Sequence, residues 1–120
     1  MMNQELETLL EIQDLKSQRR ELADEAGDRE VQEQVFGLSV DDALRDIDAK
    51  ILEMEESLPP AVRSRYKRVS QRRPRVVAPV INGTCYGCFV AVPTASASDA
   101  ERNAEIRSCE NCGRFLYYVD

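Results

Sequence analysis

Two cysteine pairs restrict the folds open to this chain more than any other feature. Cys85 and Cys88 form one Cys-x2-Cys pair, Cys109 and Cys112 form a second, and 20 residues separate the pairs. Two intervening residues let both sulfurs of a tight turn face one metal ion, and a loop of this length lets the second pair complete a tetrahedron. The spacing therefore favours one structural zinc ion, Zn2+, held by four cysteines.

Three other uses of the four cysteines remain open at this stage. Two local disulfides are one, although a disulfide within Cys-x2-Cys is strained and a reducing compartment disfavours it. A thioredoxin-like redox pair is another, but it needs a βαβ setting that the pattern lacks. An iron–sulfur cluster also uses four thiolates. Ligand type and spacing favour zinc over all three.

The cysteine pairs also bear on catalysis. Gly87 lies inside the first pair and Gly113 follows the second, where tight turns need glycine, and we expect backbone N–H groups there to donate to the thiolates. Four thiolates leave no metal position for water or substrate. The sequence has no histidine, which removes the commonest general base and the usual partner of a Ser or Cys nucleophile. We predict that the protein is not an enzyme.

Charge is distributed in blocks along the chain. Residues 1–58 carry a net charge of −11, residues 59–76 carry +7, and residues 77–120 carry −2. The central block is the basic segment, residues 63–75, and its bases together with Arg114 are candidate contacts for a nucleic acid or a protein partner. The bases of the segment are Arg63, Arg65, Lys67, Arg68, Arg72, Arg73 and Arg75.

Helical periodicity dominates the first half of the chain. Residues 3 to about 26 predict a helix with Arg19 at one position of its apolar seam. The apolar seam residues are Ile12, Leu15, Leu22 and Ala26. Residues 28–38 suggest a bend with a short helical turn. A second helix is expected from Ser39, as its cap, to residue 58. Its heptad seam consists of Val40, Leu44, Ile47, Ile51, Met54 and Leu58. The two helices predict an antiparallel hairpin that is able to self-associate.

The pattern changes after the prolines at positions 59 and 60. Proline favours the first turn of a helix, so residues 61 to about 70 predict a short basic helix that Pro74 ends. Residues 76–81, 89–92 and 115–119 are strand candidates, and Asn82-Gly83 predicts a turn. The expected fold is α+β: a helical hairpin arm over residues 1–58, a basic connecting helix over 59–75, and a small C-terminal zinc ribbon over 76–120.

These residues resemble the bacterial C4-type zinc-ribbon family over about positions 58–120. The resemblance is carried by residues 65–68, 76–88, 92–93 and above all 106–118, with the sequence Cys112-Gly113-Arg114-Phe115-Leu116-Tyr117-Tyr118 at its end. It implies an N-terminal coiled-coil hairpin before the ribbon and the four cysteines as zinc ligands. Here the arm is shorter than in the family, and Glu110-Asn111 stands where a proline is usual in the second turn.

The resemblance also implies a class of function. Members of that family are adaptors, some linked to flagellar or type III secretion control through secretion components, a sigma factor or messenger RNA. Zinc-bearing coiled-coil factors that enter the RNA polymerase secondary channel are a more distant alternative, and Asp41-Asp42 is the sole match to their acidic tip. We therefore expect a non-enzymatic adaptor with a protein partner, and as an alternative a protein that binds RNA or DNA through the basic segment.

The start of the sequence bears on location. The first seven residues are acidic and lack the basic and apolar stretches of a secretory signal. Apolar runs fall short of the roughly 20 residues that span a bilayer. The expectation is a cytoplasmic protein without membrane insertion, in a compartment where free thiols are available for a metal.

Overall fold

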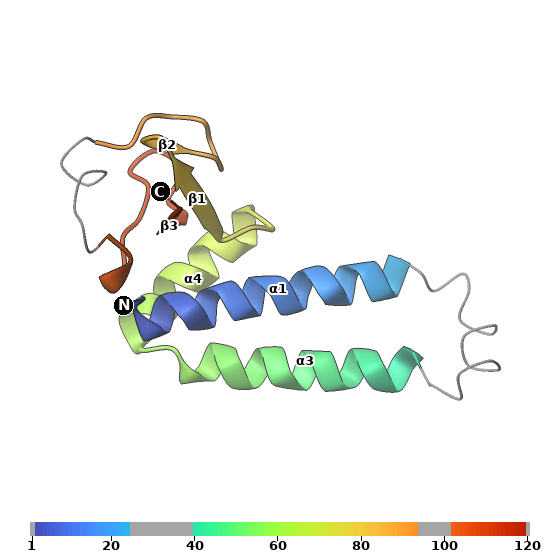
Figure 1. Ribbon diagram of the computed structural model, residues 1–120. Coiled ribbons are helices and arrows are strands. Elements are labelled where there is room, and N and C mark those ends of the chain that lie inside the picture. The colour runs from blue at the N-terminus through green and yellow to red at the C-terminus, as the bar shows by residue number, and fades with distance from the viewer. Residues whose placement is uncertain (1, 25–39, 94–101, 120) are drawn as a thin grey trace. The chain divides into compact units, whose positions relative to one another are not determined.

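The helices and strands of the chain group into two compact units. The computed structural model describes residues 2–24, 40–93 and 102–119. One unit comprises Met1–Leu10 and Leu58–Asp120, and the other comprises Glu11–Ser57. Three α-helices and a three-stranded sheet occur within the described ranges (Figure 1), so the predicted α+β class is confirmed. The bend expected over residues 28–38 and the cap expected at Ser39 lie outside those ranges.

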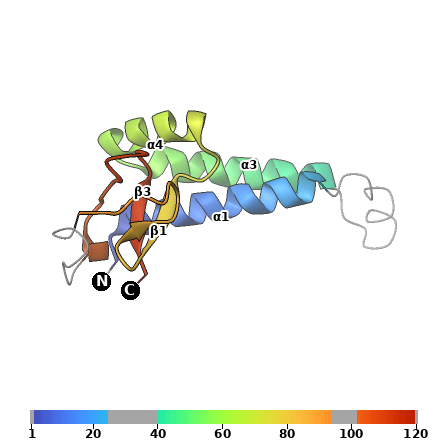
Figure 2. The same cartoon turned by 90° about the horizontal axis from the view of Figure 1, so that it is seen from above.

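The unit of residues 11–57 is a pair of helices. Helix α1 spans Gln4–Asp24, so most of it belongs here, and helix α3 spans Val40–Ser57. The two run side by side in both views (Figures 1 and 2). Val40 and Ile51 are buried on α3, and Leu44, Ile47 and Met54 are half-buried. The predicted seam is therefore the inward face of α3. None of the described helices has the length and apolar character needed to cross a membrane.

Two ion pairs show that these helices are antiparallel. Lys16 Nζ lies 3.6 Å from Glu55 Oε2, and Arg19 pairs with Asp48 through Nε and, at 3.2 Å, through Nη2. Arg19, the later of the two residues on α1, thus pairs with Asp48, the earlier of the two on α3. Arg19 is the charged residue at a predicted seam position. Its side chain lies at the edge of the apolar seam and pairs there with α3. Its hydrogen bond keeps the pKa of Asp48 below the ordinary value, although such exposed pairs contribute little to stability.

Helix α4, Pro60–Arg72, begins and ends as its prolines dictate. Pro60 occupies the first turn, where a missing N–H costs nothing. Arg73 precedes Pro74 and is extended, with φ −133° and ψ 130°, because a following proline disfavours the helical conformation. Tyr66 and Val69 are buried on the inward face, so the bases between them point outward. The helix is slightly longer than the predicted 61–70.

The sheet has the strand order β2-β1-β3. Strand β1, Val77–Ile81, pairs antiparallel with β2, Thr84–Cys85, and parallel with β3, Phe115–Tyr118. Asn82 and Gly83 both have positive φ, 52° and 75°, as a two-residue hairpin turn requires. The turn and two of the three predicted strands are confirmed. Residues 89–92 form a single bridge, Thr84 to Ala91, because Phe89 at φ 61° turns the chain out of an extended path.

The N-terminus is bound to the ribbon by a contact that the sequence pattern did not predict. Asn3 caps α1 by accepting the Leu6 N–H at Oδ1, 3.1 Å away. The Asn3 N–H donates to the Asn103 carbonyl at 2.6 Å. The Asn103 side chain in turn bonds both backbone groups of Tyr118, at 2.7 and 2.8 Å. The first turn of α1 is thereby joined to the last strand of the sheet.

The seam assignment predicts a sharp contrast between two neighbouring residues of α3. Ile51 is 7% exposed and Leu52 is 55% exposed. Ile51→Ala should lower the free energy of unfolding of the helix pair by about 2–4 kcal/mol, because it leaves a cavity in the seam. Leu52→Ala is the control and should change it by less than about 0.5 kcal/mol. Urea unfolding of the zinc-saturated protein, followed by circular dichroism, measures both; equal losses would contradict the assignment.

Candidate metal centre

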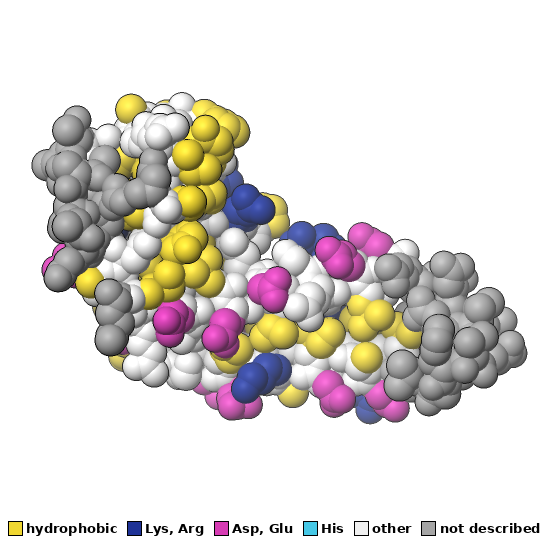
Figure 3. Space-filling model, viewed as in Figure 1, with side chains coloured by type: hydrophobic (Ala, Val, Ile, Leu, Met, Phe, Trp, Pro, Cys, Tyr) yellow, Lys and Arg dark blue, Asp and Glu magenta, His cyan; other side chains and the backbone are white. Residues whose placement is uncertain are grey.

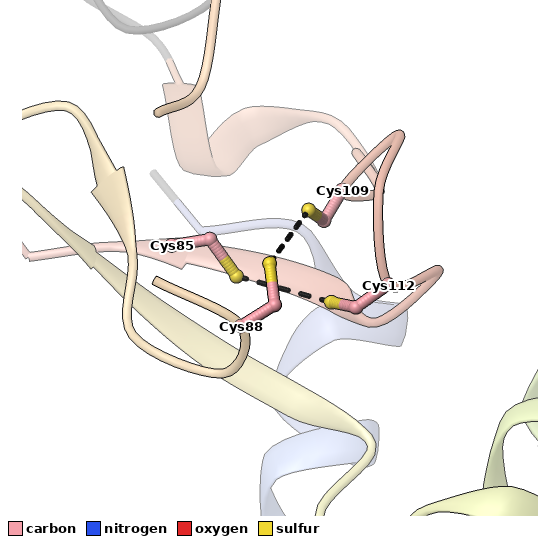
Figure 4. Close-up of side chains that lie close together, drawn as sticks. All are labelled: Cys85, Cys88, Cys109 and Cys112. Atoms are coloured by element: carbon pink, nitrogen blue, oxygen red, sulfur yellow. Dashed lines mark hydrogen bonds between the residues drawn. The ribbon is translucent and has the colours of Figure 1, made fainter. Parts of the chain in front are cut away.

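The four cysteine sulfurs converge on one point (Figure 4). The Sγ atoms of Cys85 and Cys112 are 3.9 Å apart, those of Cys88 and Cys109 are 3.7 Å apart, and all four lie within 4.8 Å of one another. A zinc ion with Zn–S bonds of about 2.3 Å gives a tetrahedron with edges of about 3.8 Å. All four cysteines are free, and both separations are far longer than a disulfide of about 2.05 Å. The residues fit one structural Zn2+.

Both short separations join one cysteine pair to the other. We call residues 85–88 the first knuckle and residues 109–112 the second knuckle. The first knuckle begins at the last residue of β2, and two residues separate the end of the second from the start of β3. A metal at their meeting point therefore closes a loop between parts of the chain that are more than 20 residues apart. Its role is structural, since four sulfurs complete the coordination shell.

Each knuckle directs backbone N–H groups at its first sulfur. Burial raises the pKa of the free Cys85 thiol to about 12, while the N–H groups of Cys88 and Gly87 donate to its sulfur and oppose the shift. Burial likewise raises the pKa of Cys109, opposed by the N–H groups of Cys112 and Asn111. The two turns thus repeat one arrangement, in which the residues two and three positions later donate to the thiolate. The expected N–H donors are confirmed.

The second knuckle also donates to a sulfur of the first. The Asn111 side chain lowers the pKa of the free Cys88 thiol to about 6, and the Val90 N–H donates to the same sulfur. Cys88 is half-buried, whereas Cys85 and Cys109 are buried. Asn111 is one of the two residues between the cysteines of the second knuckle, and its amide supplies a thiolate donor from outside the first knuckle.

Gly87 and Gly113 are required by two different constraints. Gly113 has φ 81°, a conformation that residues with a side chain rarely adopt, so its turn needs glycine as predicted. Gly87 lacks positive φ. A Cβ there would lie 2.7 Å from both Cδ and Nη1 of Arg114 and 3.0 Å from the Ala78 Cβ. Position 87 is restricted to glycine by lack of space and not by its backbone conformation.

The hydrophobic core beside the site is small. It consists of Ala78, Val80, Cys85, Val92, Cys109, Leu116 and Tyr118, with Cys88 and Cys112 packed against it. Four of these nine residues are the metal ligands themselves. A core of this size buries little apolar area, and the metal bonds replace what it lacks.

The basic segment lies on the outside of α4 and its C-terminal extension. Six of its seven bases are exposed; Arg63 is half-buried and donates from Nη2 to the Leu58 carbonyl at 2.9 Å. Among the described residues of this unit, acidic side chains form no ion pair with the other six. Arg65 donates to the Ser108 hydroxyl, beside the second knuckle. The remaining predicted contact, Arg114, is only 8% exposed and so is separated from the exposed set.

A groove runs between the basic segment and the second knuckle. Its volume is about 710 Å³. One wall carries Arg65, Arg68, Arg72 and Arg73, and the other is formed by residues 108–113, including the carboxylate of Glu110. One wall of this groove is a helix, and the other is a turn whose shape depends on the metal.

The ribbon aromatics Phe89, Phe115, Tyr117 and Tyr118 differ in exposure, and Tyr117 is half-buried. Phe115 and Tyr118 are buried, at 0% and 4% exposed, and belong to the interior. Phe89 is 71% exposed, and its ring lies 5.6 Å from that of Tyr86, which is 42% exposed. Tyr86 was not predicted as a surface contact. Its position inside the first Cys-x2-Cys pair, directly after Cys85, was the sequence feature that could have indicated this exposure.

Comparisons with known proteins agree with this geometry. Residues 84–116 match the family model of the C4-type zinc ribbon domain. The chain is also similar to CT398 from Chlamydia trachomatis, solved at 2.12 Å resolution, with 26% sequence identity and a TM-score of 0.55. The match covers 78% of this chain and 39% of that one, so it spans about two fifths of the length of CT398. A comparison with curated proteins gave no match.

Removal of one ligand tests the structural role of the metal. Cys109→Ser should abolish stoichiometric zinc binding and unfold residues 76–120, because the small core does not hold the knuckles together alone. Helices α1 and α3 should persist, since their seam lies outside the ribbon. Zinc content by mass spectrometry and amide chemical shifts by NMR provide the measurements. A variant with full zinc content and native ribbon shifts would contradict the assignment.

Proposed function

We propose that this protein is a non-enzymatic adaptor, a regulatory protein that acts through protein–protein contacts of its helical arm and its ribbon. A metal site with four thiolates supports a structural centre rather than a reactive one. Reducing conditions keep the thiols available for zinc, so the proposal locates the protein in the cytoplasm. The helical arm offers a second surface: acidic side chains flank an apolar band along the helix pair (Figure 3).

The exposed side chain of Phe89 is the observation that carries this proposal. An aromatic side chain that is 71% exposed forgoes the free energy of burial. Its positive φ adds backbone strain, which persists in proteins chiefly at functional positions. Tyr86 and Val90, each 42% exposed, extend the same apolar tip. Aromatic residues of this kind are the usual anchors of protein interfaces. We name residues 86, 89 and 90 the knuckle tip.

Substitution of the anchor tests the adaptor function. Phe89→Ser should remove the proteins that bind the knuckle tip, whereas Leu52→Ser, a control at an equally apolar exposed position on α3, should retain them. Affinity capture from the native host, quantified against both variants, identifies such proteins. Binding of the purified pair should then weaken by at least about 30-fold in Phe89→Ser, a loss of 2 kcal/mol or more. Identical capture by all three forms would refute an adaptor role for the tip.

The second function supported by a specific observation is nucleic-acid binding. Six exposed bases have no acidic partner in their described unit, and four of them, Arg65, Arg68, Arg72 and Arg73, border a groove of about 710 Å³. Arginine predominates among them, and its planar guanidinium can donate two hydrogen bonds to one phosphate group. The stripe of Arg65, Arg68 and Arg72 follows one face of α4 over about 10 Å, at 1.5 Å per residue. The net charge of −6 opposes broad attraction of polyanions, so any binding should be confined to this stripe.

Titration with labelled single-stranded RNA and duplex DNA, each at two salt concentrations, tests this alternative. Arg72/Arg73/Arg75→Ala should weaken RNA binding and reduce the salt slope by about 2, at about 0.7 per lost phosphate contact. Arg20/Arg45/Lys50→Ala is the control, because it changes net charge equally but on the acidic arm. Equal loss in both variants, or no binding at low salt, would exclude the basic segment as a nucleic-acid surface.

A further inference from the structure

Arg114 is a buried charge in a part of the protein that has little core. It follows Gly113 at the end of the second knuckle and precedes β3. Among the described residues it is the one charged side chain that is buried, at 8% exposed. Removing a guanidinium from water is costly unless opposite charge or hydrogen bonds compensate. Its surroundings must therefore supply that compensation.

The known contacts of Arg114 account for only part of the compensation. Its Nε donates to the Arg75 carbonyl at 3.0 Å. Its Nη1 is buried and has no hydrogen-bond partner in the described chain. No carboxylate of the described residues forms an ion pair with it. A single neutral carbonyl offsets only part of the cost of burying a full positive charge.

The guanidinium lies against the first knuckle. Its Nη1 and Cδ occupy the space next to Gly87, 2.7 Å from where a Cβ would stand. The Gly87 N–H donates to the Cys85 sulfur, so Arg114 supports the turn that carries this ligand. Four thiolates around Zn2+ leave a net charge of about −2. A bound metal centre would therefore place negative charge on the knuckle that the arginine packs against.

We propose that Arg114 is a positioning residue of the zinc site, which locks the two knuckles together. It lies two residues after the second knuckle, and its side chain fills the space next to Gly87 in the first. Its charge offsets part of the negative charge of the tetrathiolate, and its bond to the Arg75 carbonyl fixes the guanidinium in place. Glycine at position 87 follows from this arrangement, because any side chain there would displace the arginine.

Three substitutions of Arg114 separate charge from packing. Arg114→Met keeps a long stem without the charge, and Arg114→Lys keeps the charge without the fork. Lys67→Met is a control that removes a charge from an exposed position in the same unit. Zinc affinity and the rate of zinc release are measured by competition with a chromophoric chelator. Ribbon folding at saturating zinc is checked by NMR.

The proposal predicts that Arg114→Met weakens zinc binding about 10- to 100-fold, the range for residues that support metal ligands. Arg114→Lys should recover a large part of this loss, and Lys67→Met should bind zinc as the unmodified protein does. Equal affinities for the Met and Lys variants would mean that the charge contributes nothing. An affinity of Arg114→Met within twofold of the unmodified protein would overturn the proposal.

A double-mutant cycle with Gly87 keeps the test decisive if Arg114→Met fails to fold. Gly87→Ala should accelerate zinc release when Arg114 is present, because the new Cβ and the guanidinium compete for one space. The same change in an Arg114→Ala background should have a clearly smaller effect. Additive effects of the two substitutions would show that the residues act independently, and the lock would be refuted.

Discussion

The zinc–thiolate bonds hold together two turns that the rest of the ribbon is too small to unite. Each close pair of sulfurs joins the first knuckle to the second, so the metal acts across the sheet rather than within one turn. Strands β2 and β3 lie on opposite sides of β1, and each leads to or from a knuckle. The metal therefore determines where both outer strands can sit. Both sides of the ribbon, including the knuckle tip and the groove, depend on it.

Hydrogen bonds extend this organisation beyond the metal. Backbone N–H groups and the Asn111 amide surround the sulfurs, and such donors relieve the charge of a four-thiolate centre. At strand β3, the Asn103 side chain bonds the backbone of Tyr118, and its carbonyl accepts the N–H of Asn3, which caps α1. Residues of the C-terminal ribbon thus bind the first turn of α1. In this small domain, these polar contacts contribute stability that apolar burial supplies in a larger one.

Sequence reasoning anticipated the elements more completely than the contacts between them. Heptad spacing identified the α3 seam, and proline chemistry identified the start of α4, because both depend on near neighbours. The Asn3–Asn103 contact could not be foreseen, since nothing local marks residues 100 positions apart as partners. Gly87 shows the same limit: a turn glycine was expected, but the reason lies in Arg114. Phe89 likewise breaks a strand pattern through its backbone conformation.

X-ray absorption at the zinc edge of the purified protein tests the central claim, that one zinc ion joins the two knuckles through four thiolates, most directly. The account predicts one zinc per chain, with four sulfur neighbours at about 2.3 Å and no nitrogen or oxygen in the first shell. A shell containing nitrogen or oxygen, or a zinc-free protein that keeps the ribbon folded, would contradict it.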